Sequence, residues 1–355
     1  MNLTIEQFNF NNFVFALSGF VVLFLSVFIT KFYRSFAINK AIVANPNNRS
    51  LHKNFKPSGG GLVFSLICIF ALGILSLFQI FELELFMALV IGSFFASLFG
   101  FCDDIYDIDA KKKLIIQVFL SFWAIVWLNI EDYEIFKLLP QWFSIIFCSF
   151  LFVWMMNLYN FMDGIDGMAA TGTIFSCIAL IIALTITSGF SFLVIIFTIL
   201  LLSCLGFLLY NWPPASLFMG DSGSIFLGYF FGTLIMFTSF SGDISIWTWL
   251  IVFSFFFGDT CVTLLLRIFL SNKWYMPHRS HGYQNLARIL DSHNKVTFGV
   301  QTYNFIYILP LTVISVIHSE WAPFISILAL VPVIVFSLYF GPRYSMNNLK
   351  SIIKF

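Results

Sequence analysis

Long apolar runs follow one another through almost the whole chain, and they restrict the folds that it can adopt. Of its 355 residues, 60% are hydrophobic and only 10% are charged, which is more apolar than a water-soluble core requires. A helix that spans a bilayer needs roughly 20 apolar residues. Runs of about that length lie at 11–30, 62–78, 85–101, 114–130, 141–158, 169–187, 192–210, 225–240, 246–266, 298–317 and 322–340. The sequence therefore predicts an all-α polytopic membrane protein with about eleven transmembrane helices.

Basic residues indicate how these helices are oriented. If all the runs are spans, alternate loops contain 17 of the 18 Lys and Arg residues, and only Lys137 falls on the other side. Basic loop residues stay on the cytoplasmic side, so we expect an external N-terminus, a first helix that is retained and a cytoplasmic C-terminus. The chain is then one integral membrane domain over residues 1–355. Its cytoplasmic loops are expected at about 31–61, 102–113, 159–168, 211–224 and 267–297.

Four polar motifs interrupt the apolar chain, and all of them fall in the expected cytoplasmic loops or at inner helix ends. The first is the acidic pair Asp103-Asp104, which ends an apolar run. Adjacent carboxylates repel one another unless a cation shares them, and Mg²⁺ uses one or two carboxylates together with phosphate oxygens. Alone, the pair would be solvated surface. Together with the other motifs it indicates a site for a divalent metal and a pyrophosphate.

The second motif spaces Asn160, Asp163 and Asp166 at three-residue intervals, with Gly164 and Gly167 beside them. Glycines permit close approach of a ligand, and asparagine and aspartate side chains can read the edge of a base through donor and acceptor pairs. An ordinary Asx-rich turn between spans is the alternative.

The third motif, at 218–224, comes directly before an apolar run. Phe218 supplies a flat apolar face and Asp221 a carboxylate, while backbone N–H groups at a helix N-terminus favour phosphate. A glycine-rich start of a helix would explain the glycines but not the aspartate. We therefore expect this segment to take part in binding.

The fourth motif, His278-Arg279-Ser280-His281, lies in the last large loop. Near a pyrophosphate, its imidazoles and guanidinium would donate hydrogen bonds that neutralise charge in the transition state. The alternatives are a zinc site, for which no third soft ligand is visible, and a basic loop that binds anionic lipid. Asp259 is a further candidate because ionisable residues inside spans are often functional, although a structural salt bridge or a helix cap explains it equally well.

In order and rough spacing, these motifs resemble those of the polyprenyl-phosphate N-acetylhexosamine-1-phosphate transferases, glycosyltransferase family four, over about residues 45–290. The segment 46–61 is similar to the N-terminal motif of that family. Two positions depart from it, since Ala44 stands where the family commonly has an aspartate and the family's Thr-Pro-Arg is absent. Lys53 and Lys56 are the candidates to replace that arginine.

The resemblance implies an enzyme that transfers a sugar 1-phosphate from a UDP-sugar to undecaprenyl phosphate, releases UMP and requires Mg²⁺, with Mn²⁺ as the alternative. It implies that Asp103, Asp104 and Asp221 are catalytic groups and metal ligands. It also implies that His278, Arg279 and His281 are catalytic groups that hold the pyrophosphate. The residues that it suggests for substrate binding are Asn157, Asn160, Asp163, Asp166, Phe218, Arg49 and Lys111.

The form of the histidine motif resembles that of bacterial enzymes that begin O-antigen or capsule synthesis, which favours a UDP-N-acetylhexosamine such as UDP-GlcNAc or UDP-FucNAc. A phospho-MurNAc-pentapeptide transferase, which usually has three adjacent histidines, is the second hypothesis. We expect a multi-pass protein of the bacterial inner (plasma) membrane, with its active site facing the cytoplasm, no nucleic-acid partner and an organisation compatible with a homodimer. A transporter is the alternative of another class, but transporters bind substrate near the midplane, whereas these acids cluster at inner helix ends.

Overall fold

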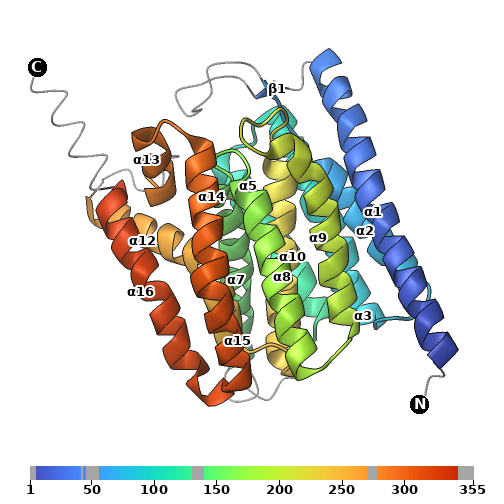
Figure 1. The fold of residues 1–355 in the computed structure, drawn as a ribbon. Helices are drawn as coiled ribbons and strands as arrows, with labels where there is room; N and C mark the ends of the chain where they lie inside the picture. Colours follow the sequence, from blue (N-terminus) through green and yellow to red (C-terminus); the bar gives the residue numbers. More distant parts are fainter. Residues whose placement is uncertain (1–4, 41–42, 45–55, 130–139, 271–278, 343–355) are drawn as a thin grey trace, which may run out of the picture.

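A computed structural model describes residues 5–40, 43–44, 56–129, 140–270 and 279–342, which form one helical bundle (Figure 1). The helices of the first half are α1 (Ile5–Asn39), α2 (Gly61–Ser76), α3 (Leu83–Leu85), η1 (Phe86–Ile91), α4 (Gly92–Tyr106), α5 (Ala110–Trp127), α7 (Gln141–Met162) and α8 (Met168–Thr187). Those of the second half are α9 (Phe192–Asn211), α10 (Asp221–Ser241), α11 (Ile246–Val252), α12 (Ser254–Leu270), α13 (Gly282–Ile289), α14 (His293–Tyr303), η3 (Asn304–Ile308), α15 (Leu309–Ile317), η4 (Ser319–Trp321) and α16 (Ala322–Phe340). Two short strands, β1 (Val43–Ala44) and β2 (Lys56–Pro57), pair antiparallel.

Each apolar run that we expected to span the membrane lies largely on helix. In the described part of the chain, eight helical segments are long and apolar enough to cross a membrane, and the bent pair α11–α12 adds a ninth if it is one span. The all-α polytopic membrane fold is therefore confirmed. The number of eleven spans and their orientation in the membrane remain predictions.

α10 is the most enclosed of these candidate spans, with 78% of its apolar stretch buried. It packs against α2, α4 and α7. A Cβ atom added at Gly228 would lie 2.4 Å from the Cα atom of Met156 in α7, so only glycine fits there. Small residues let helix backbones meet closely inside a membrane, where packing contributes strongly to association. The start of α10, which carries Asp221, is therefore held between several neighbours.

The π-helical turn η1, which directly precedes α4, is hydrogen-bonded to α10. The hydroxyl of Tyr229 in α10 donates a 2.9 Å hydrogen bond to the carbonyl oxygen of Ala88 in η1. A buried hydroxyl needs a partner in apolar surroundings, and π turns are local departures from regular α-helical pairing. A Cβ atom at Gly92 would lie 1.9 Å from the same hydroxyl. This contact fixes α4, whose last turn carries the acidic pair, against α10.

The span that we expected at 246–266 is broken near its middle, where α11 and α12 meet at 81°. α12 therefore turns away from the direction of its neighbours and packs against α16, α7 and α13 (Figure 1). This turn brings Asp259 to the start of α13, where the N–H of Gly282 bonds to its carboxylate.

Helices also extend further into the expected loops than the apolar runs do. α1 continues to Asn39, past the loop start expected at about residue 31, and α4 includes both residues of the acidic pair. α13 and the first turns of α14 occupy much of the region expected as a loop at 267–297. The polar motifs are therefore held largely by helix ends, which makes their positions better defined.

Candidate active site

The acidic pair at the end of α4 meets the first turn of α10. The two carboxylate oxygens of Asp104 accept hydrogen bonds from the backbone N–H groups of Asp221 at 2.8 Å and Ser222 at 3.1 Å. Such N–H groups have no partner within their own helix, and a helix N-terminus attracts negative charge. Asp104 therefore caps α10 from a different helix. Its role as a catalytic group and metal ligand remains a prediction.

Asp103 and Asp221 converge on a lysine from the first turn of α5. The ammonium group of Lys113 forms an ion pair with Asp103 and lies 3.2 Å from Oδ2 of Asp221. The other oxygen of Asp221 accepts a 2.7 Å hydrogen bond from Nδ2 of Asn160, near the end of α7. We call Asp103, Lys113, Asn160 and Asp221 the acidic cluster. Its members come from α4, α5, α7 and α10, and they bring together parts of three of the sequence motifs.

The acidic cluster accommodates positive charge between two carboxylates, because the ammonium group of Lys113 already occupies that position. Mg²⁺ prefers oxygen ligands and commonly uses one or two carboxylates together with phosphate oxygens and water. Asp103 and Asp221 therefore fit a magnesium site from which the Lys113 side chain has moved aside. No three His, Cys, Asp or Glu side chains are grouped for metal binding among the residues that the structure describes.

Asp163 follows α7 directly, beside the acidic cluster. Burial raises the pKa of its carboxyl group well above the usual range, and the negative charges of Asp221 and Asp104 raise this pKa further. A hydrogen bond from the backbone of Gly220 offsets part of the effect. The surroundings of Asp163 therefore favour its protonated form.

Asp166 and Phe218, two of the residues expected to bind substrate, are connected by Lys56. The ammonium group of Lys56 lies 5.3 Å from the centre of the Phe218 ring and 4.0 Å from Oδ2 of Asp166. That oxygen also accepts a 2.9 Å hydrogen bond from the N–H of Ala215, and Nδ1 of His293 lies 3.3 Å from Oδ1. A flat ring with a cation over it and a carboxylate beside it offers the stacking and hydrogen-bonding groups that a nucleotide requires.

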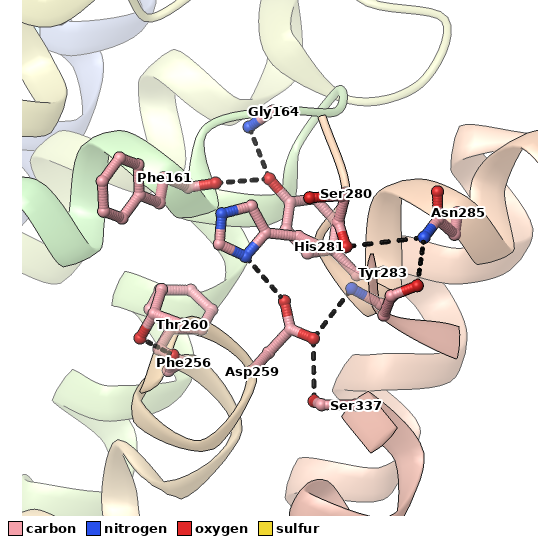
Figure 2. Close-up of polar contacts among 12 residues, drawn as sticks. Phe161, Gly164, Phe256, Asp259, Thr260, Ser280, His281, Tyr283, Asn285 and Ser337 are labelled. Carbon is pink, nitrogen blue, oxygen red and sulfur yellow. Dashed lines mark hydrogen bonds and ion pairs between the residues drawn. The ribbon is translucent and has the colours of Figure 1, made fainter. Parts of the chain in front are cut away.

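The described part of the histidine motif contacts the turn between α7 and α8 (Figure 2). The hydroxyl of Tyr283 donates to the carbonyl oxygen of Phe161 at 2.6 Å and accepts from the N–H of Gly164 at 3.0 Å. His281 is buried beside this connection, with Nδ1 at 3.1 Å from Oδ2 of Asp259. The second and fourth motifs are thus adjacent in the fold.

Five other residues were predicted for the site, and the structure describes three of them. Asn157 donates a 2.9 Å hydrogen bond to Oε1 of Gln117, which ties α7 to α5. Lys111 is exposed at the start of α5. Arg49 and His278 lie outside the described residues. Arg279 is described, and its carbonyl oxygen accepts a hydrogen bond from the side chain of Arg288.

Comparison with known proteins agrees with the arrangement of these motifs. Residues 86–239 match the model of a family described as glycosyl transferase family 4. A phospho-N-acetylmuramoyl-pentapeptide-transferase of Nautilia profundicola is 30% identical over 269 residues, which cover 65% of this chain and 74% of that protein. The chain belongs to glycosyl transferase family 4. The resemblance to polyprenyl-phosphate N-acetylhexosamine-1-phosphate transferases is thereby confirmed, and the protein is a phosphosugar transferase of that family.

Other relatives of this family 4 transferase carry a different name. A probable undecaprenyl-phosphate N-acetylglucosaminyl 1-phosphate transferase of Bacillus subtilis is 27% identical over 305 residues, or 84% of each chain. An undecaprenyl-phosphate alpha-N-acetylglucosaminyl 1-phosphate transferase of Thermotoga maritima is 28% identical over 74% of this chain and 79% of that protein. Family membership therefore establishes the reaction class, while its members differ in the sugar that they transfer.

Sequence reasoning about this family 4 transferase missed three residues of the site. Lys113 is the last of three consecutive lysines, which we used only to orient the helices. It lies four residues before Gln117, a spacing that shares a helix face, but the contact of Gln117 with α7 is known only from the structure. Tyr283 belongs to the extended histidine motif but was given no role, and His293 carried no signal, since the partners of both lie on segments far away in the sequence.

We expect the substitution Asp163→Asn to improve thermal stability more at alkaline than at acidic pH. Because the pKa of Asp163 is raised in the folded state, folding gains stability from its proton below the unfolded pKa of about 4 and loses it as the pH rises through the folded pKa. Asparagine does not titrate, so the variant escapes this loss. Thermal unfolding of the purified protein at about pH 5 and about pH 8 measures the difference. Thr260→Val, which changes no ionisable group, is the control, and an equal effect of Asp163→Asn at both pH values would contradict the expectation.

Proposed function

We propose that this protein transfers N-acetylhexosamine 1-phosphate from a UDP-sugar to undecaprenyl phosphate, giving undecaprenyl-diphosphate-sugar and UMP. The observation that carries this proposal is the acidic cluster, in which four helices bring Asp103, Lys113, Asn160 and Asp221 together. We place the cluster at the cytoplasmic face of the bacterial plasma membrane, because basic residues concentrate in the loops on that side. The reaction would be the first membrane step in the synthesis of a cell-surface polysaccharide.

The lipid acceptor would approach along the exposed sides of α4 and α5. Ile105 and Tyr106 in α4 and Leu114 and Ile115 in α5 are exposed apolar residues within a few positions of the acidic cluster. The apolar carbons of a polyprenyl tail would cost about 0.8 kcal/mol per CH₂ in water, so the tail remains in the bilayer. Its phosphate can then approach the ammonium group of Lys113 from the membrane side.

The reaction needs positioning and charge neutralisation more than proton removal. A phosphate oxygen of the lipid attacks the sugar-attached phosphorus of the UDP-sugar, and UMP leaves with the electrons of the broken P–O bond. A phosphate monoester has its second pKa near 6, so the acceptor is mostly a dianion at neutral pH and needs little help in losing a proton. We therefore assign Asp103 and Asp104 to positioning, and such effects provide most of the catalysis in phosphoryl transfer.

A magnesium ion would be held by Asp103 and Asp221, and when bound it would supply positive charge to the phosphates. Lys113 supplies a further positive charge from the protein itself. Asn160 orients the carboxylate of Asp221 through its hydrogen bond to Oδ1. These contacts explain why a membrane helix bundle keeps so many polar groups at one end.

The donor would lie between the acidic cluster and the surface formed by Phe218, Lys56 and Asp166. Its uracil ring would stack on Phe218, which requires Lys56 to move from its position over the ring. The displaced ammonium group then has a partner in the pyrophosphate. His281 and Arg279 would donate hydrogen bonds to the same pyrophosphate and neutralise its charge.

A direct assay tests this proposal and identifies the donor. Purified protein in detergent would be incubated with undecaprenyl phosphate, Mg²⁺ and a panel of UDP-sugars that includes UDP-GlcNAc, UDP-FucNAc and UDP-MurNAc-pentapeptide, and UMP release would be measured. We expect release from a UDP-N-acetylhexosamine that depends on both lipid and metal. Release of UMP from UDP-MurNAc-pentapeptide alone would show instead that the protein is a phospho-MurNAc-pentapeptide transferase. Uptake of solute into vesicles without any UMP release would support a transporter and contradict the proposal.

A further inference from the structure

Asp259 is a fully enclosed carboxylate on α12 that has no part in the reaction as described so far (Figure 2). Its Oδ1 atom accepts hydrogen bonds from the backbone N–H of Gly282 at 2.9 Å and from the hydroxyl of Ser337 at 2.8 Å. Its Oδ2 atom lies 3.1 Å from Nδ1 of His281. The carboxylate therefore connects α12 with α16 and with the first residues of α13.

The contacts of Asp259 determine which nitrogen of His281 carries hydrogen. A backbone N–H can only donate, so Oδ1 of Asp259 must accept from Gly282. An ionised carboxylate has no hydrogen to donate, so the bond between Oδ2 and His281 requires a hydrogen on Nδ1. A partner on one ring nitrogen fixes the tautomer and the orientation of an imidazole. The Asp259 side chain thus selects one of the two arrangements available to the ring.

The other ring nitrogen of His281, Nε2, lies on the side away from Asp259. Figure 2 shows this side of the ring facing the end of α7 and the turn that carries Gly164. The rings of His281 and Phe161 are 5.6 Å apart between centres, and Tyr283 bonds to the backbone of both Phe161 and Gly164. This turn connects Asn160 with Asp166, so Nε2 faces the segment that forms one side of the candidate active site.

We infer that Asp259 is a positioning residue that orients His281 for the transfer reaction. It keeps a hydrogen on Nδ1 and leaves Nε2 directed toward the site where the pyrophosphate of the donor would lie. The inference rests on the proposed function, so its test includes a measurement that needs no substrate.

The substitution Asp259→Asn separates this positioning role from packing, because it preserves the shape of the side chain. The oxygen of the new amide must still accept from the N–H of Gly282, so its NH₂ group faces His281 and can only donate. Nδ1 must then accept, and the hydrogen moves to Nε2. We expect ¹⁵N NMR spectra of histidine-labelled protein to show a protonated Nδ1 in the native chain and an unprotonated Nδ1 in the variant. The His281→Gln variant identifies the signals of this ring.

Activity provides the second measurement. In Asp259→Asn we expect kcat for UMP release to fall about 10-fold to 100-fold, as for other partners that orient a working histidine, while the KM for the UDP-sugar changes less than about threefold. Thr260→Val is the matched control, because in the described part of the chain the Thr260 hydroxyl bonds to carbonyl groups of α12 itself. It should keep both values within about twofold. Ser337→Ala removes one donor to Asp259 and should retain the hydrogen on Nδ1.

Two results would overturn the inference: a protonated Nδ1 in Asp259→Asn, or a loss of kcat no larger than that of Ser337→Ala. If Asp259→Asn does not fold, His281→Asn replaces it, because its amide can bond to Asp259 but has no atom at the position of Nε2. That variant should keep its thermal stability and lose kcat, and full activity would reject the inference. The tautomer of His281 could change in Asp259→Asn while the native protein transfers no sugar phosphate. In that case the positioning of His281 by Asp259 stands and the proposed function is rejected.

Discussion

Asp221→Asn is expected to reduce sugar-phosphate transfer by about 10³-fold or more while leaving the fold intact. The asparagine oxygen can still accept the hydrogen bond from Asn160, which leaves its NH₂ group facing the ammonium group of Lys113. Two hydrogen-bond donors, the amide NH₂ group and the Lys113 ammonium group, then face each other where the Asp221 carboxylate attracted the ammonium group. The acidic cluster loses one negative charge and one of the two oxygens that fit a metal ion. UMP release at saturating UDP-sugar and undecaprenyl phosphate measures the loss.

The matched control for this prediction is Asp243→Asn, just beyond the opposite end of α10. Asp243 accepts a hydrogen bond from Ser241 and lies far along the helix from the acidic cluster. We expect this variant to retain activity within about twofold, since surface changes away from a site have small effects. Circular dichroism and size-exclusion chromatography should show both variants folded. More than about a tenth of native activity in Asp221→Asn would contradict the assignment of Asp221 to the reaction.

Gly100→Ala is expected to have the second-largest effect, through the backbone rather than through a reactive group. A Cβ atom at this position would lie 2.2 Å from the carbonyl oxygen of Asp221 and 2.7 Å from the Cα atom of Ser222. These are backbone atoms of the α10 start, which Asp104 holds in place, so they cannot turn away as a flexible side chain would. α4 must move instead. We expect the unfolding free energy to fall by about 1–3 kcal/mol and transfer to fall by at least about 100-fold, because small displacements of reacting groups are costly.

Gly73→Ala provides the control for Gly100→Ala. Gly73 lies inside α2, and an added Cβ atom there would meet no atom within 4 Å. Alanine in a helix is about 0.5–1 kcal/mol more favourable than glycine, so this variant should be as stable as the native protein or more stable. Thermal unfolding and UMP release of both variants in the same detergent give the comparison. Native stability together with native activity in Gly100→Ala would show that α4 and α10 tolerate separation.

The helices of this fold could be predicted because they depend on a property that each segment carries by itself. An apolar run of span length has to satisfy its backbone hydrogen bonds internally in lipid, and a helix does so. The break between α11 and α12 was not predicted, because residues 246–266 read as one continuous apolar run. That break depends on how α12 packs against α16, α7 and α13, which no local pattern contains.

The residue types of the candidate site could be predicted from the sequence, but most of the contacts between those residues could not. The acidic residues and the asparagine of the second motif stood out because polar side chains at the ends of apolar helices indicate a structural or functional role. The capping of α10 by Asp104 could not be predicted, since its partners lie 117 and 118 residues further along the chain. Lys113 was overlooked for a related reason. A lysine at a helix start is ordinary in sequence, and only its ion pairs with Asp103 and Asp221 distinguish it.

Lys113 lies between the carboxylates of Asp103 and Asp221. Its ammonium group therefore competes with any dissolved cation for that position. The local concentration of the Lys113 ammonium group is determined by the chain, so it does not change with the salt content of the cell. Potassium and sodium carry the same single charge and no N–H donors, and they gain nothing by replacing it. A divalent ion attracts each carboxylate twice as strongly at the same distance. We therefore expect the cluster to favour divalent cations over monovalent ones once a phosphate group draws Lys113 away.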